Sequence, residues 1–475
     1  MSDQKVRTIE APERSLPVID EADVVVVGGG SSGFNAATAA GRMGARTILI
    51  ERNGYLGGCT TAPYNTSVGI IYDSDGNKII RGTCEEFVDR MISDGQARHE
   101  STHNQLWPPY TMKVAIDMIE DSGVELYLYT LASDIVFKDG IVEGIIVESK
   151  QGRGVILCKT VADCSADADI AAWTGAPFRM EDPDDLQQIS SDFIACGVDH
   201  KRVREWAIAN KEQLNLKVTG LESEVKDFGA QEMLTITIPN ASSSVDETGR
   251  MHHVGVMPTV KLCLYREAVR IQGNVNVDPL DPKALTVAEK EGIKGAIEHL
   301  EYLKETVEGF GGAFIVTKSH LGVRESRQIL GDYYISLHDV KNQARFDDVI
   351  CLNCRALDYH LKGTVFKIEF LKGNHDVPLR ALLPTTAENV EVGGRCISCD
   401  HLSQASIRGA ATCMATGQAA GLTAAMAALQ GKQVRDLDVR EVQKALIDQS
   451  VVLSTVDSRK PWKEEPFTLR ERFGN

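Results

Sequence analysis

The sequence predicts an α/β fold built on a mainly parallel sheet, with a second, α+β unit in the middle of the chain. Two observations lead to this prediction. Near the start, apolar strand-like runs alternate with an Ala-rich helical stretch, and a long run of small residues follows near the other end. Between these regions, charged helical stretches flank a few short strand-like segments.

The first unit lies between residues 23 and 51. Val24–Val27 is an unbroken β-branched run, which is typical of a strand buried on both faces. The Ala-rich stretch Phe34–Met43 predicts a helix, and Thr47–Ile50 predicts a second buried strand. Together these segments predict one βαβ unit.

The turn inside this unit carries Gly28, Gly30 and Gly33 at the G-x-G-x-x-G spacing. Gly28 permits the tight turn, Gly30 lets a pyrophosphate approach the backbone, and Gly33 lets the helix pack closely on the strand. The free N–H groups at the helix start can bind the phosphates. Glu51 ends the second strand and can accept hydrogen bonds from an adenosine ribose. The unit therefore predicts a dinucleotide site, against the alternative of a chance glycine turn.

Length and charge limit the classes of function. The 475 residues suffice for two or three cores, and 43% hydrophobic with 25% charged residues is typical of a soluble protein. The net charge of -16 disfavours nucleic acid or an anionic membrane as partner, and no apolar run reaches the length of a membrane span. The first residues lack a signal-peptide core, and the cysteines lack small-domain spacing. We therefore expect a cytoplasmic protein. Whether it forms a homo-oligomer is left open.

The loop after Glu51 reads RNGYLGGCTT and should pass beside the dinucleotide. Gly57 and Gly58 allow close backbone approach, and the hydroxyls of Thr60 and Thr61 can bind phosphate or ribitol. The alternative is an ordinary surface loop.

Further strands follow between residues 123 and 158. Ile135–Phe137, Ile141–Val147 and Gly154–Leu157 are separated by the turn signals Asp139-Gly140 and 151–153. They predict a three-stranded antiparallel meander, after which residues 159–175 should re-enter the parallel sheet. We expect a first domain at 1–182, a substrate-binding cap at 183–315, a return to the first domain at 316–435 and a C-terminal tail at 436–475.

The segment His320–Val340 holds the densest polar cluster. Arg324 and Arg327 lie three residues apart, so they would share one face of a helix or one rim of a loop. Two guanidinium groups can bind a carboxylate or phosphate through paired hydrogen bonds. The alternative is that they pair with Glu325, Asp332 or other acids and only hold the domains together.

The chain resembles the FAD-dependent oxidoreductase family that is related to the flavoprotein subunit of heterodisulfide reductase and to glucose-inhibited-division-type flavoproteins. The resemblance rests on VVVVGGGSSG, ILIERNGYLGGCTT, ADCSADADIAAWTGAP, HLGVRESRQILGDYYIS and GGRCISCDHLSQASIRGAATCMATGQAAG. It leaves the stretch from Pro183 to Phe310 uncovered. The family usually carries T-G-D-A-D where this chain has Cys164-Ser165-Ala166-Asp167-Ala168-Asp169. The lost glycine affects the packing expected against the cofactor there.

The resemblance implies a Rossmann-like FAD-binding domain with FAD extended along the first βαβ unit. The late Gly-Arg segment would reach the flavin, and the start of the Ala/Gly helix that begins near residues 406–410 would stabilise negative charge at the flavin N1–C2 edge. From the motifs and the resemblance together, the residues expected to bind FAD are Gly28, Gly30, Ser31, Ser32, Gly33, Glu51, Arg52, Gly57, Gly58, Cys59, Thr60, Thr61, Ala132, Ser165, Asp167, Gly394, Arg395, Ser406 and Arg408.

Several cysteines allow other chemistry. The pairs Cys351-x-x-Cys354 and Cys396-x-x-Cys399 suggest zinc or an iron–sulfur cluster, but they lie far apart and the second pair falls within the proposed flavin segment. We therefore expect packed thiols and no metal. Cys59 is alone in its loop, which argues against a redox-active disulfide and leaves open a thiol beside the flavin.

The sequence thus predicts an FAD-dependent oxidoreductase in which flavin N5 exchanges hydride with a small organic substrate, anionic if the arginines bind it. The catalytic candidates are Arg324, Arg327, His401 and Cys59. Only one dinucleotide fingerprint is visible, so oxygen, a quinone or a separate electron-transfer protein would serve the second half-reaction. The alternatives are a flavin-dependent isomerase or hydratase without net redox, and a flavoprotein subunit that passes electrons to a partner.

Overall fold

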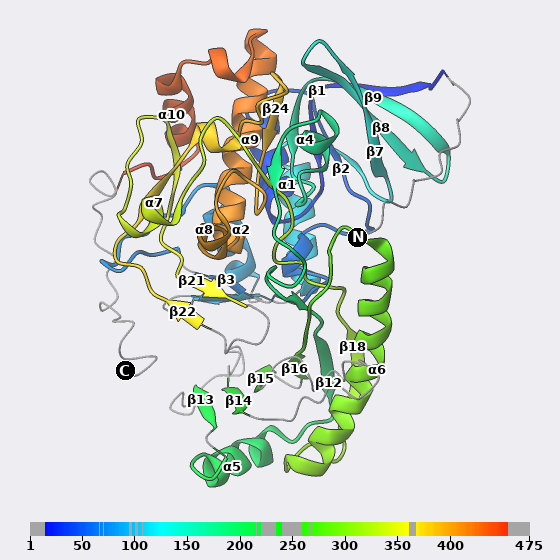
Figure 1. Cartoon of the computed structure of the whole chain (residues 1–475), viewed down its shortest axis with the longest axis vertical. Coiled ribbons are helices and arrows are strands. Elements are labelled where there is room, and N and C mark those ends of the chain that lie inside the picture. Colours follow the sequence, from blue (N-terminus) through cyan, green and yellow to red (C-terminus); the bar gives the residue numbers. More distant parts are fainter. Residues whose placement is uncertain are drawn as a thin grey trace.

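A seven-stranded sheet has the order β6-β2-β1-β9-β8-β7, with β24 paired to β9. The structure is a computed structural model and describes residues 15–65, 67–69, 71–94, 97–99, 103–106, 108–214, 216–219, 234–239, 259–265, 268–360 and 367–454. The strands are β1 (Val18–Val27), β2 (Thr47–Ile50), β6 (Glu125–Tyr127), β7 (Leu131–Lys138), β8 (Ile141–Ser149), β9 (Gly152–Asp163) and β24 (Val390–Val392). The pairings of β1, β2, β6, β9 and β24 are parallel, and β7, β8 and β9 form the antiparallel meander. This is the Rossmann-like fold that the sequence predicts (Figure 1).

Strand β9 serves both parts of this sheet. Its first half, Gly152–Leu157, pairs antiparallel with β8, and Val161–Asp163 pairs parallel with β24. Along its other edge it stays parallel to β1. The sequence suggested a meander strand followed by a separate return to the sheet. Because no turn residue stands between Leu157 and Thr160, the chain continues as one strand instead.

Two helices made of small residues lie against each other beside the sheet. They are α1 (Ser31–Arg42) and α9 (Ala410–Gln430). A Cβ added at Gly417 would lie 2.2 Å from the Ser32 carbonyl oxygen, and one added at Gly421 would lie 2.0 Å from that of Ala36. Small residues therefore bring two helix backbones together, and α9 also contacts the sheet, where the Thr160 hydroxyl donates to the Ala424 carbonyl at 3.0 Å.

Helices α2 (Thr83–Ser93) and α3 (Pro108–Glu120) extend this helical layer, and the tilted Phe34 and Phe87 rings have their centroids 5.3 Å apart. In the described part of the chain, no helix has both the length and the apolar character needed to cross a bilayer.

A second sheet of six strands has the order β13-β14-β15-β16-β12-β18 (Figure 1, lower part). Its strands are β12 (Phe193–Cys196), β13 (Lys217–Thr219), β14 (Leu234–Pro239), β15 (Thr259–Tyr265), β16 (Ala268–Gln272) and β18 (Phe314–Lys318). Helices α5 (His200–Asn210) and α6 (Pro282–Thr306) accompany it and share its separate hydrophobic cluster, which includes Phe193, Trp206, Ile271, Leu300 and Phe310. This is the predicted α+β unit, while its exact domain boundaries stay a prediction.

Several short elements complete the structure. The strand pairs are β3 (Ser67–Gly69) and β4 (Ala97–His99) with β5 (His103–Leu106), β10 (Phe178–Arg179) with β19 (Gln328–Ile329), β11 (Ile189–Ser190) with β17 (Asn274–Val275), β20 (Val349–Asn353) with β23 (His375–Pro378), and β21 (Leu357–Tyr359) with β22 (Lys367–Glu369). The short helices are α4 (Asp169–Trp173), α7 (Leu337–Lys341), α8 (His401–Ile407) and α10 (Val439–Asp448). Arg324 and Arg327 lie outside helices, on the loop that leads into β19.

Candidate active site

Two of the three motif glycines are required by internal packing. Gly28 has a φ of +96°, and a Cβ there would lie 2.5 Å from the Cys164 carbonyl oxygen. A Cβ at Gly33 would lie 1.6 Å from the Gly28 carbonyl oxygen. The tight turn and the close contact of helix with strand therefore both depend on glycine, as the sequence predicts.

Gly30 differs from these two glycines. It caps the N-terminus of α1 in an extended conformation, with φ of -71° and ψ of -170°. A Cβ added there would meet only the Gly58 Cα, at 3.8 Å. Packing within the protein does not require glycine at this position, whereas a pyrophosphate lying against the helix start does. The site thus fits the dinucleotide expected from the motif.

Glu51 is buried at the end of β2 and is already hydrogen-bonded. Its Oε2 accepts from the Gly29 N–H at 2.7 Å, and its Oε1 accepts from the Asn53 N–H and side-chain amide, both at 2.7 Å. The carboxylate therefore fixes the glycine turn against the loop after β2, a role that the sequence did not reveal. Arg52 beside it is exposed, and Ala132 lies near the start of β7.

The loop after Glu51 lies directly against the start of α1. The Gly57 N–H donates to the Gly29 carbonyl at 2.9 Å, and Gly57 and Gly58 have φ of +100° and +53°. The Thr60 and Thr61 hydroxyls donate to the Gly57 and Gly58 carbonyls, each at 2.8 Å. The loop position agrees with the prediction, but these two hydroxyls fold the loop itself.

Cys59 and Ser31 meet at this contact. The Cys59 Sγ lies 3.6 Å from the Ser31 Oγ. Burial raises the pKa of Cys413 in the first turn of α9 to about 12, and the nearby Cys59 adds to this rise. The loop and the N-terminal end of α9 are thus electrostatic neighbours.

The predicted flavin-end residues gather around Asp167. Its Oδ1 lies 2.7 Å from an Arg395 guanidinium nitrogen and accepts from the Ser326 hydroxyl at 2.6 Å. Arg327 donates to the Asp167 carbonyl at 3.0 Å and to the Asp169 carboxylate at 2.8 Å. Three segments that are distant in sequence therefore converge at this point.

Gly394 and Ser32 complete the same region. A Cβ on Gly394, whose φ is +102°, would lie 3.2 Å from the Ser32 Cβ, and the Gly394 N–H donates to the Thr416 hydroxyl at 3.1 Å. Ser165 donates its hydroxyl to Asp163 at 2.6 Å and so shapes the turn before α4. These contacts place the end of β24 beside the start of α1.

Ala166 takes the place of the glycine in the family's usual T-G-D-A-D sequence, and its backbone keeps a glycine-like conformation. Its φ is +76°, in the left-handed region that costs an L-residue about 1–2 kcal/mol. Ala168 also has a positive φ, of 54°. The turn is therefore preserved in spite of the lost glycine, at some cost in backbone strain.

A second cluster joins the remaining catalytic candidates. His401 Nδ1 lies 2.7 Å from the Glu325 carboxylate, whose other oxygen accepts from the Gln187 N–H at 3.0 Å. The Gln187 side chain donates to Gln404 at 2.6 Å and accepts from the Arg408 Nε at 3.1 Å. The network therefore links His401 to Arg408 through buried groups.

Arg324 joins the same network from the other side. The Gln404 side chain donates to the Arg324 carbonyl at 2.8 Å. The Arg324 guanidinium donates to the Gln188 carbonyl and, at 3.0 Å, to Asn274 Oδ1. Arg324 and Arg327 thus bind different partners: Arg327 pairs with the acid Asp169, as the alternative interpretation allowed, whereas Arg324 bonds a carbonyl and an amide oxygen.

Asp358 gathers further arginines beside this network. Its Oδ2 lies 2.5 Å from Arg355 and 3.4 Å from Arg408, and its Oδ1 lies 3.0 Å from His360. Burial raises the pKa of Asp358, but Arg355, His360 and Arg408 outweigh it and hold that pKa well below its usual value. Ser406 donates its hydroxyl to the Arg355 carbonyl.

Four further residues of these clusters could not be predicted from the sequence, because they belong to no recognisable motif: Gln187, Gln404, Arg355 and Asp358. The one usable signal was Asp358-x-His360, because alternate residues of a strand share a face.

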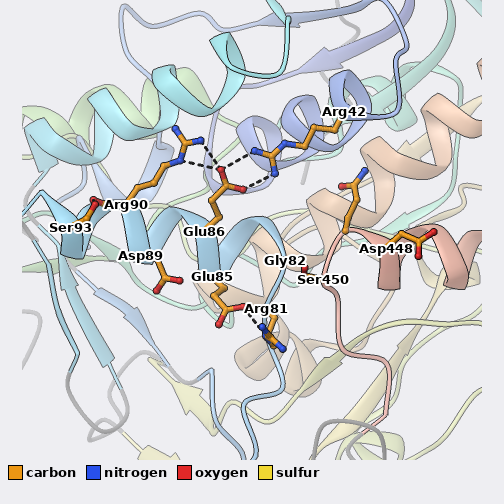
Figure 2. Close-up of a pocket in the computed structure, with 11 residues that line it drawn as sticks. Arg42, Arg81, Gly82, Glu85, Glu86, Asp89, Arg90, Ser93, Asp448 and Ser450 are labelled. Carbon is orange, nitrogen blue, oxygen red and sulfur yellow. Dashed lines mark hydrogen bonds and ion pairs between the residues drawn. The ribbon is translucent and has the colours of Figure 1, made fainter. Parts of the chain in front are cut away.

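Figure 2 shows a surface pocket of about 670 Å³ that is separate from both clusters. Glu86 lies between Arg42 and Arg90, at 2.6 and 2.8 Å, and Arg81 pairs with Glu85 at 2.7 Å. None of the predicted site residues lines it, and its arginines are already paired with carboxylates. It is therefore not the cofactor site.

The cysteine pairs are buried. Desolvation raises the pKa values of Cys354, Cys396 and Cys399 well above the usual thiol value, so these groups stay as thiols. Within the described residues, no group of three or more His, Cys, Asp or Glu side chains is arranged to hold a metal ion.

Comparison with known proteins identifies relatives of the chain. The family described as FAD dependent oxidoreductase matches residues 23–446. A thiamine thiazole synthase from Aeropyrum pernix is 26% identical over 133 residues, which are 28% of this chain and 46% of that protein. A tRNA uridine 5-carboxymethylaminomethyl modification enzyme MnmG from Listeria welshimeri is 30% identical over 140 residues, covering 27% of this chain and 22% of that protein. The matches thus span less than half the length of these relatives.

Among solved structures, a geranylgeranyl bacteriochlorophyll reductase-like protein from Thermoplasma acidophilum aligns with a TM-score of 0.44 and 11% identity, over 92% of this chain and 86% of that one. The expected relation to the flavoprotein subunit of heterodisulfide reductase stays a prediction.

Proposed function

This chain belongs to the FAD-dependent oxidoreductase family, and we propose that it exchanges hydride between its FAD and a small organic substrate bound where the two sheets meet. When bound, FAD supplies the two-electron chemistry at N5. The observation that carries the proposal is the buried network that brings Arg324, Arg408 and His401 together beside the start of α9.

On the cofactor side, the protein would bind FAD at both ends. The pyrophosphate would lie against Gly30 and the first turn of α1, with Glu51 toward the ribose. At the flavin end, the half-buried Asp167–Arg395 ion pair would offer hydrogen bonds to the flavin. The loop with Gly57 and Gly58 would keep water from the pyrophosphate, because it already lies against the glycine turn.

On the substrate side, His401 is suited to hold a proton. Burial lowers its pKa, but the hydrogen bond to Glu325 outweighs burial and raises it above its usual value. Because Glu325 bonds Nδ1, Nε2 is the nitrogen that can exchange a proton with the substrate. Arg324 and Arg408 would orient the substrate, since guanidinium groups fix an oxyanion with little reorganisation.

Anaerobic mixing of the FAD-loaded protein with a panel of small hydroxy, amino and unsaturated acids tests this function. We expect at least one compound to bleach the flavin absorbance, and oxygen, a quinone or an electron-transfer protein to restore it. The Gly30→Ala variant is the control, because its Cβ fits the protein but would lie in the pyrophosphate path, so FAD and bleaching should both be lost.

Conversion of a panel compound without bleaching would favour an isomerase or hydratase. Absence of bleaching together with stoichiometric binding of an iron–sulfur protein would favour an electron-transfer role. Either result contradicts hydride exchange with a small substrate.

A further inference from the structure

The polar cluster between the two sheets carries more positive than negative charge. Arg355 and Arg408 share the Asp358 carboxylate, and hydrogen bonds through Gln404 and Gln187 link Arg324 to Arg408. His360 adds no charge near neutral pH, because burial and then the positive charge of Arg324 lower its pKa to about 3.

The neighbouring acids Asp192 and Glu325 attract Arg324 and Arg408, but each has a nearer partner outside the three arginines. Asp192 lies 2.5 Å from Arg270, and Glu325 lies 2.7 Å from His401. Within the part of the chain that the structure describes, Arg324 bonds a carbonyl and an amide oxygen but no carboxylate. Three guanidinium groups therefore face one carboxylate, which leaves an excess of two positive charges.

This excess charge lies in a poorly solvated place. The side chains of Arg408 and Arg355 are 10% and 19% exposed. Burial lowers the pKa of Arg324 to about 10 and that of Arg408 to about 9, so both still carry charge at neutral pH. A buried charge without a counter-charge raises the free energy of the folded protein. An anion bound here would supply the counter-charge that the protein itself lacks.

Asn274 provides a second, independent observation beside Arg324. Its side chain is 1% exposed, and its Oδ1 accepts from Arg324 at 3.0 Å. Its Nδ2 has no hydrogen-bond partner within the described residues. Buried amide donors are rarely left unbonded, so this N–H₂ group indicates an acceptor that comes from outside the protein.

The cluster also adjoins the expected flavin end. Arg408 directly precedes Gly409, the N-cap of α9, and a Cβ added at Gly409 would lie 2.3 Å from the Arg355 Cδ. Asn274 comes from β17 on the cap side, and Arg408 follows α8 on the FAD side. A ligand held here would therefore contact both parts of the protein next to the cofactor.

We propose that Arg324, Arg355 and Arg408, with the Asn274 amide, form the substrate subsite for an organic dianion, either a dicarboxylate or a phosphate-bearing compound. This inference rests on the proposed function and names its substrate class. The two negative charges would balance the two excess guanidinium groups, and the planar forks would fix the oxyanions through paired hydrogen bonds.

Binding of simple anions to the FAD-loaded protein tests the subsite without requiring turnover. Succinate and sulfate are the dianionic probes, acetate is the monoanionic probe, and the readouts are perturbation of the flavin spectrum and the melting temperature. We expect at least one dianion to bind ten-fold or more tightly than acetate. Preference for succinate would indicate a dicarboxylate substrate, and preference for sulfate would indicate a phosphate-bearing one.

The variants Arg324→Gln and Arg408→Gln should weaken binding of the preferred dianion about 10–100-fold and affect acetate less. The affinity of Arg324→Lys, which keeps the charge, should lie between those of the Gln variants and the wild type. This variant replaces the Gln variants in the test if they fail to fold. Arg380→Gln is the matched control, because Arg380 pairs with Asp348 at 2.9 Å away from the cluster, and it should bind the dianion as the wild type does.

Equal affinity for acetate and the dianions, or unchanged dianion binding in the arginine variants, would overturn the subsite. A different result would separate the two proposals. If dianion binding depends on Arg324 but no panel compound bleaches the flavin, the subsite is supported and hydride exchange is rejected.

Discussion

At Ala166, the backbone holds a conformation that suits glycine better than alanine. We predict that Ala166→Gly stabilises the protein by about 0.5–1 kcal/mol, because it removes left-handed strain that exceeds the entropy glycine adds to the unfolded chain. Thermal unfolding of the FAD-free protein measures this change. Ala172→Gly, within α4, is the control and should lower stability by about 1 kcal/mol. Destabilisation by Ala166→Gly would show that the Ala166 methyl group makes a packing contribution larger than the strain.

Glu391 on β24 is fully buried, and neither of its carboxylate oxygens has a hydrogen-bond partner within the described residues. Burial raises its pKa well above 4.5, so the folded protein keeps a proton that the unfolded chain releases. Its contribution to stability is therefore full below pH 4.5 and is lost as the pH rises toward the folded-state pKa, by up to about 1.4 kcal/mol per pH unit.

We predict that Glu391→Gln removes this loss, so the variant becomes increasingly more stable than the wild type between pH 5 and 7. Melting temperatures of both proteins across that range provide the measurement. Asp163, whose pKa burial raises to about 6, titrates in both proteins, and its contribution cancels in the difference. A difference in melting temperature that does not change with pH would contradict the prediction.

Between elements, the contact of α1 with α9 depends on two glycines one helical turn apart. We predict that Gly421→Ala destabilises the protein by about 1–3 kcal/mol, because the new Cβ would lie 2.0 Å from the Ala36 carbonyl oxygen and force the helices apart. The shift of α1 should also weaken FAD binding. Denaturant unfolding and FAD titration measure the two effects.

Gly311→Ala is the matched control for this change, because nothing lies within 4 Å of its Cβ position. It should leave both quantities nearly unchanged or raise stability slightly. If Gly421→Ala behaved in the same way, the two helices would have to be less rigidly packed than the structure shows.

Local elements could be predicted from the sequence because their signals are local. The strand Thr47–Ile50 was predicted with its exact bounds, whereas the first helix, predicted at Phe34–Met43, runs from Ser31 to Arg42. The continuity of β9 was missed because a change of pairing partner leaves no mark on the strand itself. The hydrophobic pattern and the turn residues indicate the local conformation of a segment. They do not indicate which other strand pairs with it.

The backbone geometry of the candidate site was predictable only where a motif carries it, and the binding roles of its residues stay predictions. Gly28, Gly33 and the loop at Gly57 lie as expected, because glycine spacing encodes a backbone geometry. The pairing of Arg324 with Arg327 was inferred from sequence spacing, but an extended loop directs the two guanidinium groups to different partners. Gln187 and Gln404 meet across 217 positions of sequence, a contact that no local pattern encodes.

For the whole molecule, polar contacts link the two sheets beside the expected flavin. Gln187 and Asn274 lie near the cap, whereas Gln404 and Arg408 lie on or next to α8. Because Gln187, Gln404 and Arg408 are hydrogen-bonded to one another across the two parts, they specify one relative placement more strictly than apolar contacts would. The same groups that hold the parts together are therefore those that the proposed substrate would contact.

The packing of α1 against α9 also affects how the protein is made. The ribosome completes the glycine motif and α1 early, but α9 begins only at Ala410. At synthesis rates of about 5–20 residues per second, the nascent chain waits some tens of seconds for the helix that covers α1. During that interval the motif is present without its structural support. Cofactor capture should accordingly be a late event in biosynthesis, and the exposed apolar face of α1 should be a target for chaperones until then.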